Sequence, residues 1–580
     1  MAANWKLKPK VPSEFLEKFP EISQVTAQLL YNRGLFDEEI IETFLNPEYT
    51  NLYDPFIFRD MEKAVARTWK AIQNKEKIVI YGDYDADAVT ANAVLQQTFR
   101  YLDVPISSYI PDRFTEGYGL NVDAFKKLTD EGAQVVITVD CGTNSIDVAE
   151  FCKEAGIDLI ITDHHEITGD NPQSFALINP KNKEDTYPDP QITGVGVAYK
   201  FACALLSKKT EVCAQKGIVE DQFVAGWDKW LLDLVAIGTV ADCHSLFGEN
   251  RILVSLGLKV FPKTKWLGLR MLLASSGVDM AKQPVDTYTL GFTVAPRINA
   301  AGRLEHAGVA VDLLMETDPA RAQEFAAKLE QINKRRQDVT SRVVSEAQEQ
   351  AVLLQDRKVI LVAHADWHKG VVGLAAGRLA EQYQRPVIVL ERGETESTGS
   401  ARAGNGFNMV ECLKYASDYL VKYGGHRQAA GLTVQSDKID KFYGAILDYA
   451  EQNPLAEVEP AMELEAELVA EDLSLATYDS VSQLEPYGMG NPKPKFLIRN
   501  AELMQLRLVG SNQKHAQVTF KVGSTQVSGI GFSFAERMQK FAPGDILDIA
   551  AELMADSWNG YQNLKLRLVD IKLHEQEANY

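Results

Sequence analysis

The chain has 580 residues, of which 46% are hydrophobic and 24% are charged, a composition typical of a folded globular protein. Its 60 basic and 80 acidic residues give a formal net charge of −20, which excludes a protein that coats nucleic acid through general electrostatic attraction. A local basic groove remains compatible with this charge. The length exceeds what one hydrophobic core can organise, so we expect about three or four domains.

The sequence carries no signal for export or membrane insertion, and we expect a cytoplasmic protein. The first residues lack an apolar signal region, and no uninterrupted apolar stretch approaches the length that spans a bilayer. The six cysteines contain no CxxC pair. This spacing favours reduced, mostly buried thiols over a zinc site or a disulfide framework.

Apolar strand-like runs alternate with helical patterns from about residue 77 to residue 245, as expected of a parallel sheet built from βαβ units. Three of the runs, and one helical stretch before residue 242, are each followed by acidic or imidazole side chains. These side chains belong to Asp83, Asp85, Asp87, Asp140, His164, His165 and Asp242. Because open α/β sheets bind ligands at the carboxyl ends of their strands, we expect these residues to converge.

The convergent carboxylates indicate a metal site. Carboxylates that lie close together repel one another unless a cation is present, and hard divalent cations take oxygen ligands. An imidazole in the set favours Mn²⁺ over a pure Mg²⁺ site. Two such ions would support hydrolysis of a phosphoester, with His165 as a ligand, as the residue that orients water or as the proton donor to the leaving group. Taken alone, the cluster at residues 83–87 also fits a solvated acidic turn.

The remaining chain predicts further domains. A helix with Asp318 as its cap and Pro319 in its first turn would span roughly 50 Å if it is continuous; we interpret the charged residues 333–338 as its solvated face. Period-2 alternation near the C-terminus indicates a small β-barrel, for which we favour an OB-fold. The predicted domains are an N-terminal segment at 1–50, an α/β domain at 51–315, a connecting helix at 316–354, a second α/β domain at 355–455 and a barrel at 456–580.

Several ordered motifs carry a resemblance to a known family. Asp163-His164-His165, preceded by Asp85-Ala86-Asp87 and Asp140 and followed by Asp242, resembles the DHH phosphoesterase superfamily. Within it, further segments resemble the single-strand-specific 5′ exonucleases. Those segments are 111–120, 248–251, 295–303, 367–373, 399–402, 424–426 and 486–492. The resemblance covers roughly residues 50 to 575.

The resemblance implies a fold and a function. The first α/β domain would be a parallel-sheet DHH domain, the second a DHH-associated domain, and the barrel an OB-fold that binds nucleic acid. The implied activity is metal-dependent 5′→3′ exonuclease action on single-stranded DNA, yielding 5′ mononucleotides in DNA repair and recombination. We expect a monomer, with single-strand binding protein and a RecQ-type helicase as partners.

The resemblance also implies site residues. The expected ligands of two divalent cations, Mn²⁺ or Mg²⁺, are Asp83, Asp85, Asp87, Asp140, His164 and Asp242. The expected catalytic residues are Asp85, Asp140, His164 and His165. The expected substrate-binding residues are Arg113, Arg297, Arg303, Ser400, Arg402 and His426. For the first three of these, structural salt bridges are the alternative.

Two places depart from the family pattern. Ala88 stands where the family often has glycine, and we expect it to be tolerated unless the turn needs a positive φ. Cys243 and His244 follow Asp242 where apolar residues are common. We expect a buried thiol and an imidazole that lies outside the ligand set.

Two other functions stay open. A DHH phosphodiesterase that acts on short oligonucleotides or cyclic dinucleotides would share the acidic residues, but it needs no terminal barrel, so residues 460–575 argue against it. A non-enzymatic scaffold that binds single strands would keep the fold after losing its ligands. The intact acidic set argues against that alternative.

Overall fold

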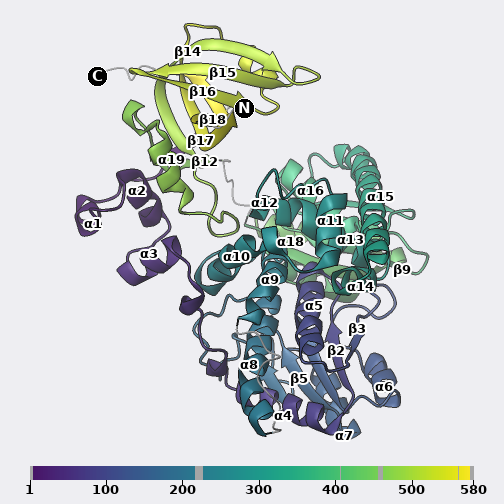
Figure 1. The fold of residues 1–580 in the computed structure, drawn as a ribbon. Helices are drawn as coiled ribbons and strands as arrows, with labels where there is room; N and C mark the ends of the chain where they lie inside the picture. Colours follow the sequence, from purple (N-terminus) through teal and green to yellow (C-terminus); the bar gives the residue numbers. More distant parts are fainter. Residues whose placement is uncertain (1–3, 216–225, 405, 455–460, 559–560, 575–580) are drawn as a thin grey trace. The chain divides into compact units, whose positions relative to one another are not determined.

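The protein is described by a computed structural model that covers residues 4–215, 226–404, 406–454, 461–558 and 561–574 (Figure 1). Its contacts divide the chain into two compact units. Unit 1 consists of Met1–Asp54, Cys243–Lys259 and Glu459–Tyr580, and unit 2 of Pro55–Asp242 and Val260–Val458. None of the helices in the described ranges has the length and apolar character needed to cross a membrane.

The first sheet of unit 2 is parallel throughout and follows the order β3-β2-β4-β5-β6. Every residue of β2, β4 and β6 is buried, which fits the near-continuous apolar sequence expected of a sheet covered on both faces. The strands are β2 (Ile78–Gly82), β3 (Ser107–Tyr109), β4 (Val135–Val139), β5 (Asp158–Thr162) and β6 (Ala176–Ile178).

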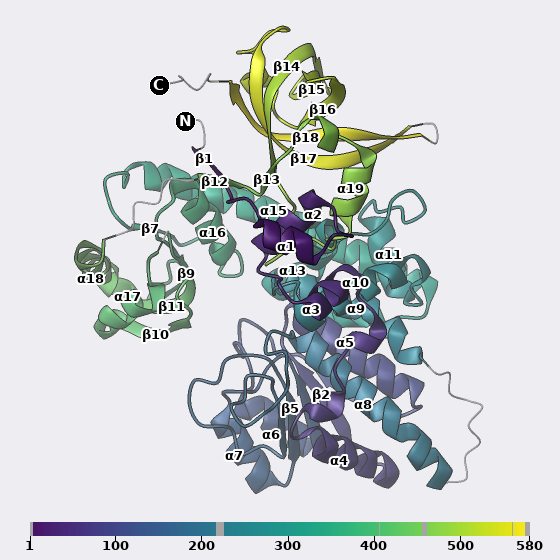
Figure 2. The ribbon, with the colours of Figure 1, turned by 90° about the vertical axis from the view of Figure 1, so that its left-hand side faces the viewer.

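Helices cover both faces of this sheet (Figures 1 and 2). On one face, Phe125 and Leu128 of α6 and Cys152 of α7 join a core with the side chains of β2, β4 and β5. On the other, α5 contacts β2, and α8 contacts β4 and β5. The helices of this part are α4 (Met61–Asn74), α5 (Ala86–Tyr101), α6 (Val122–Asp130), α7 (Ile146–Ala155), α8 (Gly194–Gln215) and α9 (Leu232–Ala241).

A helical segment follows within unit 2 and ends in the predicted long helix. The 34 residues of α15 span about 51 Å at 1.5 Å per residue, and the Asp318 side chain caps its start by accepting a hydrogen bond from the Arg321 N–H. The expected long helix is therefore present. The helices here are α11 (Leu267–Ser275), α12 (Thr287–Thr289), the π-helix η6 (Leu290–Val294), α13 (Ala295–Leu304), α14 (Gly308–Met315) and α15 (Pro319–Val352).

The second sheet of unit 2 is mixed, in the order β10-β11-β9-β8-β7, with only the β7–β8 pair parallel. Ile360 and Val389 from this sheet pack with Val343 of α15 and Leu379 of α16. The elements are β7 (Ile360–His364), α16 (Val372–Tyr383), β8 (Val387–Glu391), β9 (Glu396–Arg402), α17 (Met409–Tyr415), β10 (Leu420–Gly425), β11 (Ala429–Gln435) and α18 (Ile439–Gln452).

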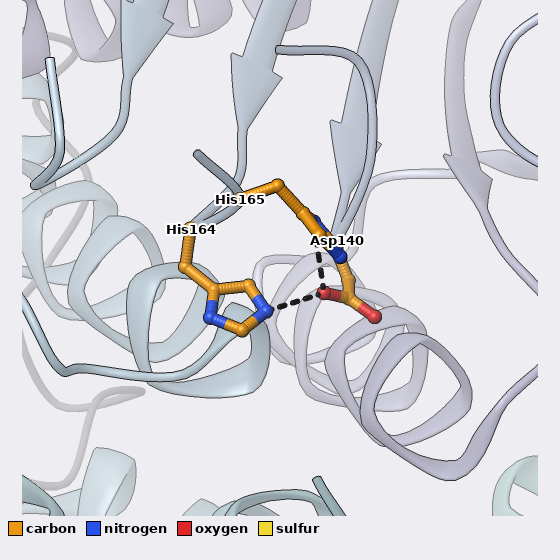
Figure 3. Close-up of side chains that lie close together, drawn as sticks. All are labelled: Asp140, His164 and His165. Atoms are coloured by element: carbon orange, nitrogen blue, oxygen red, sulfur yellow. Dashed lines mark ion pairs between the residues drawn. The ribbon is translucent and has the colours of Figure 1, made fainter. Parts of the chain in front are cut away.

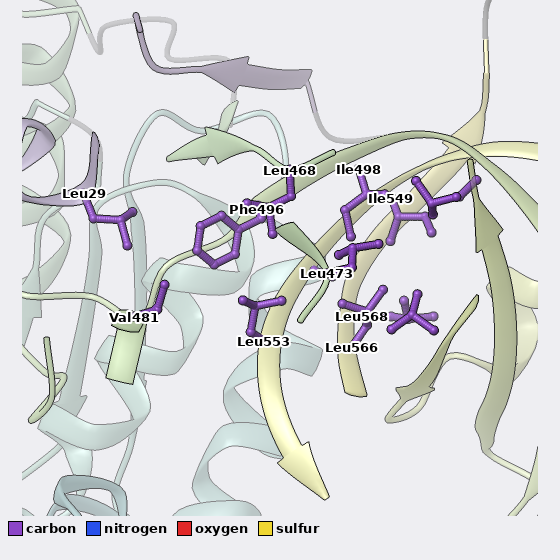
Figure 4. Packing of buried hydrophobic residues seen from close by; sticks show 14 of the residues in the cluster. Leu29, Leu468, Leu473, Val481, Phe496, Ile498, Ile549, Leu553, Leu566 and Leu568 are labelled. Carbon is purple, nitrogen blue, oxygen red and sulfur yellow. The ribbon is translucent and has the colours of Figure 1, made fainter. Parts of the chain in front are cut away.

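Unit 1 contains a closed barrel, because β14 pairs with β15 on one side and with β17 on the other. Its interior is apolar and includes Phe496, Leu553 and Leu566 (Figure 4). This agrees with the OB-like barrel predicted from the period-2 pattern. The elements are β12 (Ala461–Leu464), β13 (Ala466–Glu467), α19 (Leu475–Ser482), β14 (Phe496–Val509), β15 (His515–Val522), β16 (Thr525–Gly531), α20 (Ala535–Met538), β17 (Ile546–Trp558) and β18 (Tyr561–Leu573).

The N-terminal segment shares the hydrophobic core of the barrel. Phe15 and Leu29 belong to the same buried cluster as the barrel interior, and β1 pairs in parallel with β12. Arg251 of α10 is buried and joins this segment to the same unit, because its guanidinium lies 3.6 Å from the Phe44 ring centroid. The elements are β1 (Asn4–Leu7), α1 (Ser13–Lys18), α2 (Gln24–Asn32), α3 (Glu38–Leu45) and α10 (Gly248–Val260).

Candidate metal centre

The first three carboxylates lie where β2 ends and α5 begins. Asp83 follows β2 directly, Asp85 is the N-cap of α5, and Asp87 lies in its first turn. The Asp85 side chain accepts a hydrogen bond from the Ala88 N–H at 3.0 Å, as N-cap carboxylates do. The three alternating aspartates therefore span the end of a strand, the cap of the next helix and the first turn of that helix.

Asp140, His164 and Asp242 reach the same place from other elements. Asp140 follows β4, His164 follows β5, and Asp242 is the C-cap of α9. The His164 Nε2 atom lies 3.1 Å from Asp140 Oδ1 (Figure 3). It also lies 3.6 Å from Asp242 Oδ2 and 3.8 Å from Asp87 Oδ2. The predicted convergence at the carboxyl ends of the strands is present in the structure.

These acidic groups are buried together, and their charges are unfavourable without a cation. Burial and the charge of Asp85 raise the pKa of Asp83 well above its usual value. Burial, followed by the neighbouring Asp87 and Asp85, does the same to the pKa of Asp140. Burial and Asp85 raise the pKa of Asp242 to about 7. A bound cation would relieve this repulsion.

The donor set fits a hard divalent cation. The buried Oδ1 atom of Asp83 has no hydrogen-bond partner, a state that is costly for a carboxylate unless another positive group binds it. Ligand atoms of Asp140, His164 and His165 lie within 4.8 Å of one another. Carboxylate oxygens with one or two imidazoles suit Mn²⁺ and Mg²⁺.

The N-terminus of α8 contacts two of the carboxylates, one through hydrogen bonds and one through close packing. The Asp87 oxygens accept hydrogen bonds from the Gly194 and Val195 N–H groups, each at 2.9 Å. A Cβ atom at Gly194 would lie 2.5 Å from Asp140 Oδ1. Only glycine therefore lets α8 approach the cluster this closely, a requirement that the sequence pattern did not reveal.

His165 is oriented by two residues that we did not predict as site residues. Its Nδ1 atom lies 2.7 Å from Asp163 Oδ1, and its Nε2 atom lies 3.0 Å from the Tyr118 hydroxyl. Burial disfavours the imidazolium, but the hydrogen bond and charge of Asp163 outweigh it and raise the pKa of His165 to about 9. The position of Asp163 directly before the two histidines was the available sequence signal.

The predicted phosphate-binding residues of the second sheet lie together. Ser400 and Arg402 are two residues apart on β9 and share one face of the strand. A Cβ atom at Gly373 would lie 3.0 Å from Ser400 Oγ and 3.2 Å from an Arg402 guanidinium nitrogen, so both side chains reach the first turn of α16. His426 is close by, since its N–H bonds to Ala429, which pairs with Arg402.

The three other predicted arginines differ in their surroundings. The Arg113 guanidinium lies 4.6 Å from the Tyr84 ring centroid. Burial and the charge of Arg113 lower the pKa of Arg303 to about 10. Arg297 instead pairs with Glu330 at 2.5 Å, which is the salt bridge that we considered as the alternative.

One expectation about the departures is wrong and another is resolved. Cys243 is exposed, not buried; it follows the C-cap of α9 and has a positive φ, so the chain turns away from the helix at this residue. Ala88 lies in α5, where the backbone does not need glycine.

Arg336, which we placed on a solvated face, has a buried Nε atom with no hydrogen-bond partner.

Three regions of the chain match known family profiles. Residues 77–239 match the N-terminal domain of the DHH family, residues 356–452 match the DHHA1 domain, and residues 464–570 match the RecJ OB domain. The first match contains the strands and helices that carry all the predicted metal ligands except Asp242.

Full-length relatives and solved structures agree with these matches. The chain is 38% identical over 559 residues to the single-stranded-DNA-specific exonuclease RecJ of Bacillus subtilis, covering 96% of this chain and 68% of that protein. It is 31% identical to the protein of the same name from Haemophilus influenzae, covering 92% of each. The crystal structure of Thermus thermophilus RecJ in complex with Mn²⁺ matches with a TM-score of 0.80 and 27% identity, covering 99% of this chain and 80% of that one. With acidic motifs, domains and full-length relatives in agreement, this chain belongs to the RecJ family.

Proposed function

We propose that this protein is a metal-dependent exonuclease that hydrolyses single-stranded DNA from its 5′ end and releases 5′ mononucleotides. The observation that carries the proposal is the group of three carboxylates around His164 Nε2, all within 3.8 Å of that atom. RecJ relatives are named single-stranded-DNA-specific exonucleases, and T. thermophilus RecJ has been crystallised with Mn²⁺ and with Mg²⁺. These names support the substrate and the metal.

The metal would be held by the buried acidic cluster. We assign Asp83, Asp85, Asp87, Asp140, His164 and Asp242 as the ligands of two divalent cations, Mn²⁺ or Mg²⁺. Such a pair lowers the pKa of water and stabilises both the attacking and the leaving oxygen in phosphoryl displacement. The protein contributes geometry: α8 fixes the Asp87 carboxylate through two N–H groups and, at Gly194, packs closely against the Asp140 side chain.

His165 supplies a proton in this proposal. Asp163 holds the Nδ1 side of the ring, so the proton on Nε2 faces the open side next to the Tyr118 hydroxyl. The hydrogen bond and charge of Asp163 stabilise the protonated ring and raise the pKa of His165 above its usual value. A positioned imidazolium of this kind can protonate the leaving oxygen as the phosphodiester bond breaks.

The strand would be bound through its phosphates. Ser400 and Arg402 lie beside the first turn of α16, which has no side-chain cap, so a hydroxyl, a guanidinium and backbone N–H groups are available to one phosphate. We assign His426 to the same phosphate, and Arg113 and Arg303 to neighbouring positions along the strand. We also assign Arg297 to the strand, to which it would bind while its guanidinium remains paired with Glu330.

The domain roles follow from this assignment. We propose that residues 51–315 form the catalytic DHH domain, that the helix at 316–354 connects it to the DHH-associated domain at 355–455, and that 456–580 bind the strand through the OB-like barrel. Residues 1–50 complete the core of that barrel. The presence of the barrel favours long strands over the short oligonucleotides or cyclic dinucleotides that a smaller phosphodiesterase would take.

The cellular setting is also part of the proposal. We propose that the protein acts as a monomer in the cytoplasm, in DNA repair and recombination, with single-strand binding protein and a RecQ-type helicase as partners. The family resemblance supports these assignments.

Digestion of end-blocked strands tests the function. Single strands blocked at the 3′ end should be degraded in Mn²⁺ or Mg²⁺, while strands blocked at the 5′ end and duplexes should resist. Asp140→Ala should abolish hydrolysis, whereas Asp356→Ala, which removes an exposed acid far from the cluster in sequence, should not. Degradation of 5′-blocked strands would refute the polarity, and turnover by Asp140→Ala would refute the metal centre.

A further inference from the structure

A cavity lies in unit 2 at the far end of the helix that begins at the metal centre. Helix α5 starts next to Asp85 and ends at Tyr101, about 24 Å away at 1.5 Å per residue. At that end the structure contains a cavity of about 460 Å³, within the range of roughly 300–1,000 Å³ that is usual for small-molecule sites. None of the residues assigned to the metal or to the strand is among its described lining residues.

Aromatic rings form one part of the cavity wall. Tyr101 and Trp227 stack with their ring centroids 4.1 Å apart and their planes 9° apart. Trp266 meets Trp227 edge to face at 6.4 Å. Its indole N–H donates to the buried Asp233 at 2.8 Å, which fixes the orientation of the ring. The Lys209 ammonium also lies 4.4 Å from the Tyr101 ring centroid. This part of the wall therefore presents aromatic surface, on which a planar ligand can pack.

Basic side chains form another part of the wall. Arg100, Lys265 and Arg270 line the cavity and are exposed. One guanidinium nitrogen of Arg100 donates to the Met315 carbonyl at 2.9 Å, and the Lys265 ammonium lies 4.1 Å from the Trp230 ring centroid. Both groups keep further N–H donors. Glu316 is the acidic residue among the described lining residues, and its carboxylate is already bound by Arg321 at 3.2 Å and by two backbone N–H groups. The cavity thus concentrates positive charge in a chain whose net charge is −20.

We infer that this cavity, the aromatic-basic pocket lined by Tyr101, Trp227, Trp266, Arg100, Lys265 and Arg270, binds a nucleoside phosphate. The rings suit a planar base, and arginine and lysine suit a phosphate. A simple anion would make no contact with the aromatic wall, and an uncharged aromatic compound would leave the positive charge of the basic wall unmatched. The ligand is either a free mononucleotide, the product class of the proposed reaction, or a nucleotide within a strand; naming the free form as product rests on the proposed function.

The pocket is connected to the metal centre by two packed helices. Helix α9 begins directly after the η4 turn (Trp227–Leu231) and has Asp242 as its C-cap, while α5 begins at its N-cap Asp85 and ends at Tyr101. The two helices contact each other. A ligand in the pocket would therefore contact the C-terminal end of α5 and the η4 turn that leads into α9, and both helices have metal-centre residues at their other ends.

Equilibrium dialysis with labelled deoxyadenosine monophosphate tests the inference, using full-length Arg402→Ala protein without divalent cations so that the proposed strand site is weakened. Saturable binding is expected, with inorganic phosphate and deoxyadenosine each binding at least about tenfold more weakly. Lys265→Ala and Arg270→Ala should each weaken binding about tenfold, the loss that follows removal of one charge-assisted hydrogen bond. Lys263→Ala, an exposed neighbour outside the lining, is the matched control and should bind normally.

The outcomes separate the pocket from the catalytic function. Equal binding by the Arg270→Ala and Lys263→Ala proteins, or an absence of saturable binding, would overturn the inference. Tighter binding of an end-blocked oligonucleotide that Arg270→Ala weakens would support the pocket and identify a strand as the source of the nucleotide. Hydrolysis of 5′-phosphorylated strands by Lys265→Ala and Arg270→Ala at low product concentration should stay within about twofold of normal, so failure of the pocket and failure of the exonuclease remain distinguishable.

Discussion

Replacing Gly194 with alanine should disable the metal centre while leaving the fold in place, because this glycine packs against the Asp140 side chain. The new Cβ atom would lie 2.5 Å from Asp140 Oδ1, 2.7 Å from its Cβ and 2.8 Å from its Cγ. Rotation of the Asp140 side chain cannot relieve the contact with its own Cβ. The backbone of α8 or of the turn after β4 must move.

The size of the required movement follows from the same distances. The separation of 2.7 Å between the two Cβ atoms is about 0.7 Å short of the 3.4 Å at which ordinary van der Waals contact begins. Overpacking of this kind typically costs about 1–3 kcal/mol of stability. A displacement approaching 1 Å in a catalytic group can lower the rate about 100-fold. We therefore expect a folded protein with about 1% of the normal turnover.

The assay measures release of nucleotides from 5′-phosphorylated single strands in Mn²⁺, with thermal unfolding recorded on the same samples. Gly196→Ala is the matched control on α8, since its Cβ would meet the Ile192 side chain at 2.5 Å and not a carboxylate. It should lose stability but keep turnover within a few-fold of normal. If Gly194→Ala and Gly196→Ala are equally active, close packing of α8 against Asp140 is not needed for the reaction and the reasoning fails.

Three further predictions concern charge and stability. Burial raises the pKa of Asp233 to about 7, so the contribution of this group to stability is fully present below about pH 4 and is lost as the pH rises towards 7. Between pH 4 and pH 8 the free energy of unfolding of the unmodified protein should therefore fall by about 4 kcal/mol more than that of Asp233→Asn. Parallel pH profiles of the two proteins in chemical denaturation would contradict this. Asp83→Asn should raise the melting temperature of the metal-free protein, because it removes a carboxylate whose charge is disfavoured by burial and by Asp85, yet it should reduce the stabilisation by Mn²⁺, which for one site at 100 times its Kd is about 2.7 kcal/mol. A reduced metal-free melting temperature would count against a cation at this carboxylate. The buried Arg251 side chain donates to five backbone carbonyls, so Arg251→Met should cost about 3 kcal/mol or more in urea unfolding. Arg567→Met, at an exposed position, is the control and should cost less than about 1 kcal/mol.

The metal centre could be predicted from the sequence because its signals are local. An apolar run that ends in a charged residue marks a strand end, and the parallel arrangement then brings Asp83, Asp140 and His164 to one edge. The contacts that refine the site could not be predicted in this way. The close approach of Gly194 and the pairing of Arg297 with Glu330 depend on how helices pack, which hydrophobic periodicity does not encode.

The same limit applies to the fold. Each strand of the barrel shows its own alternation, so a small barrel could be predicted from residues 456–580. The pairing of β1 with β12 joins segments more than 450 residues apart, and no local pattern specifies such a partner. For this reason residues 1–50 were predicted as a separate segment, whereas the structure includes them in the barrel core.

The shared core of unit 1 has a consequence for synthesis of the chain on the ribosome. Phe15 and Leu29 are made early, but the strands that cover them come after residue 460. At about 5–20 residues per second, the roughly 400 intervening residues take about 20–80 s to appear. During that time the apolar faces of α1 and α2 have no native partner from the barrel. Unit 2 can fold during this interval, whereas α1 and α2 keep an exposed apolar surface. The N-terminal segment is therefore a part of the nascent chain to which a chaperone can bind.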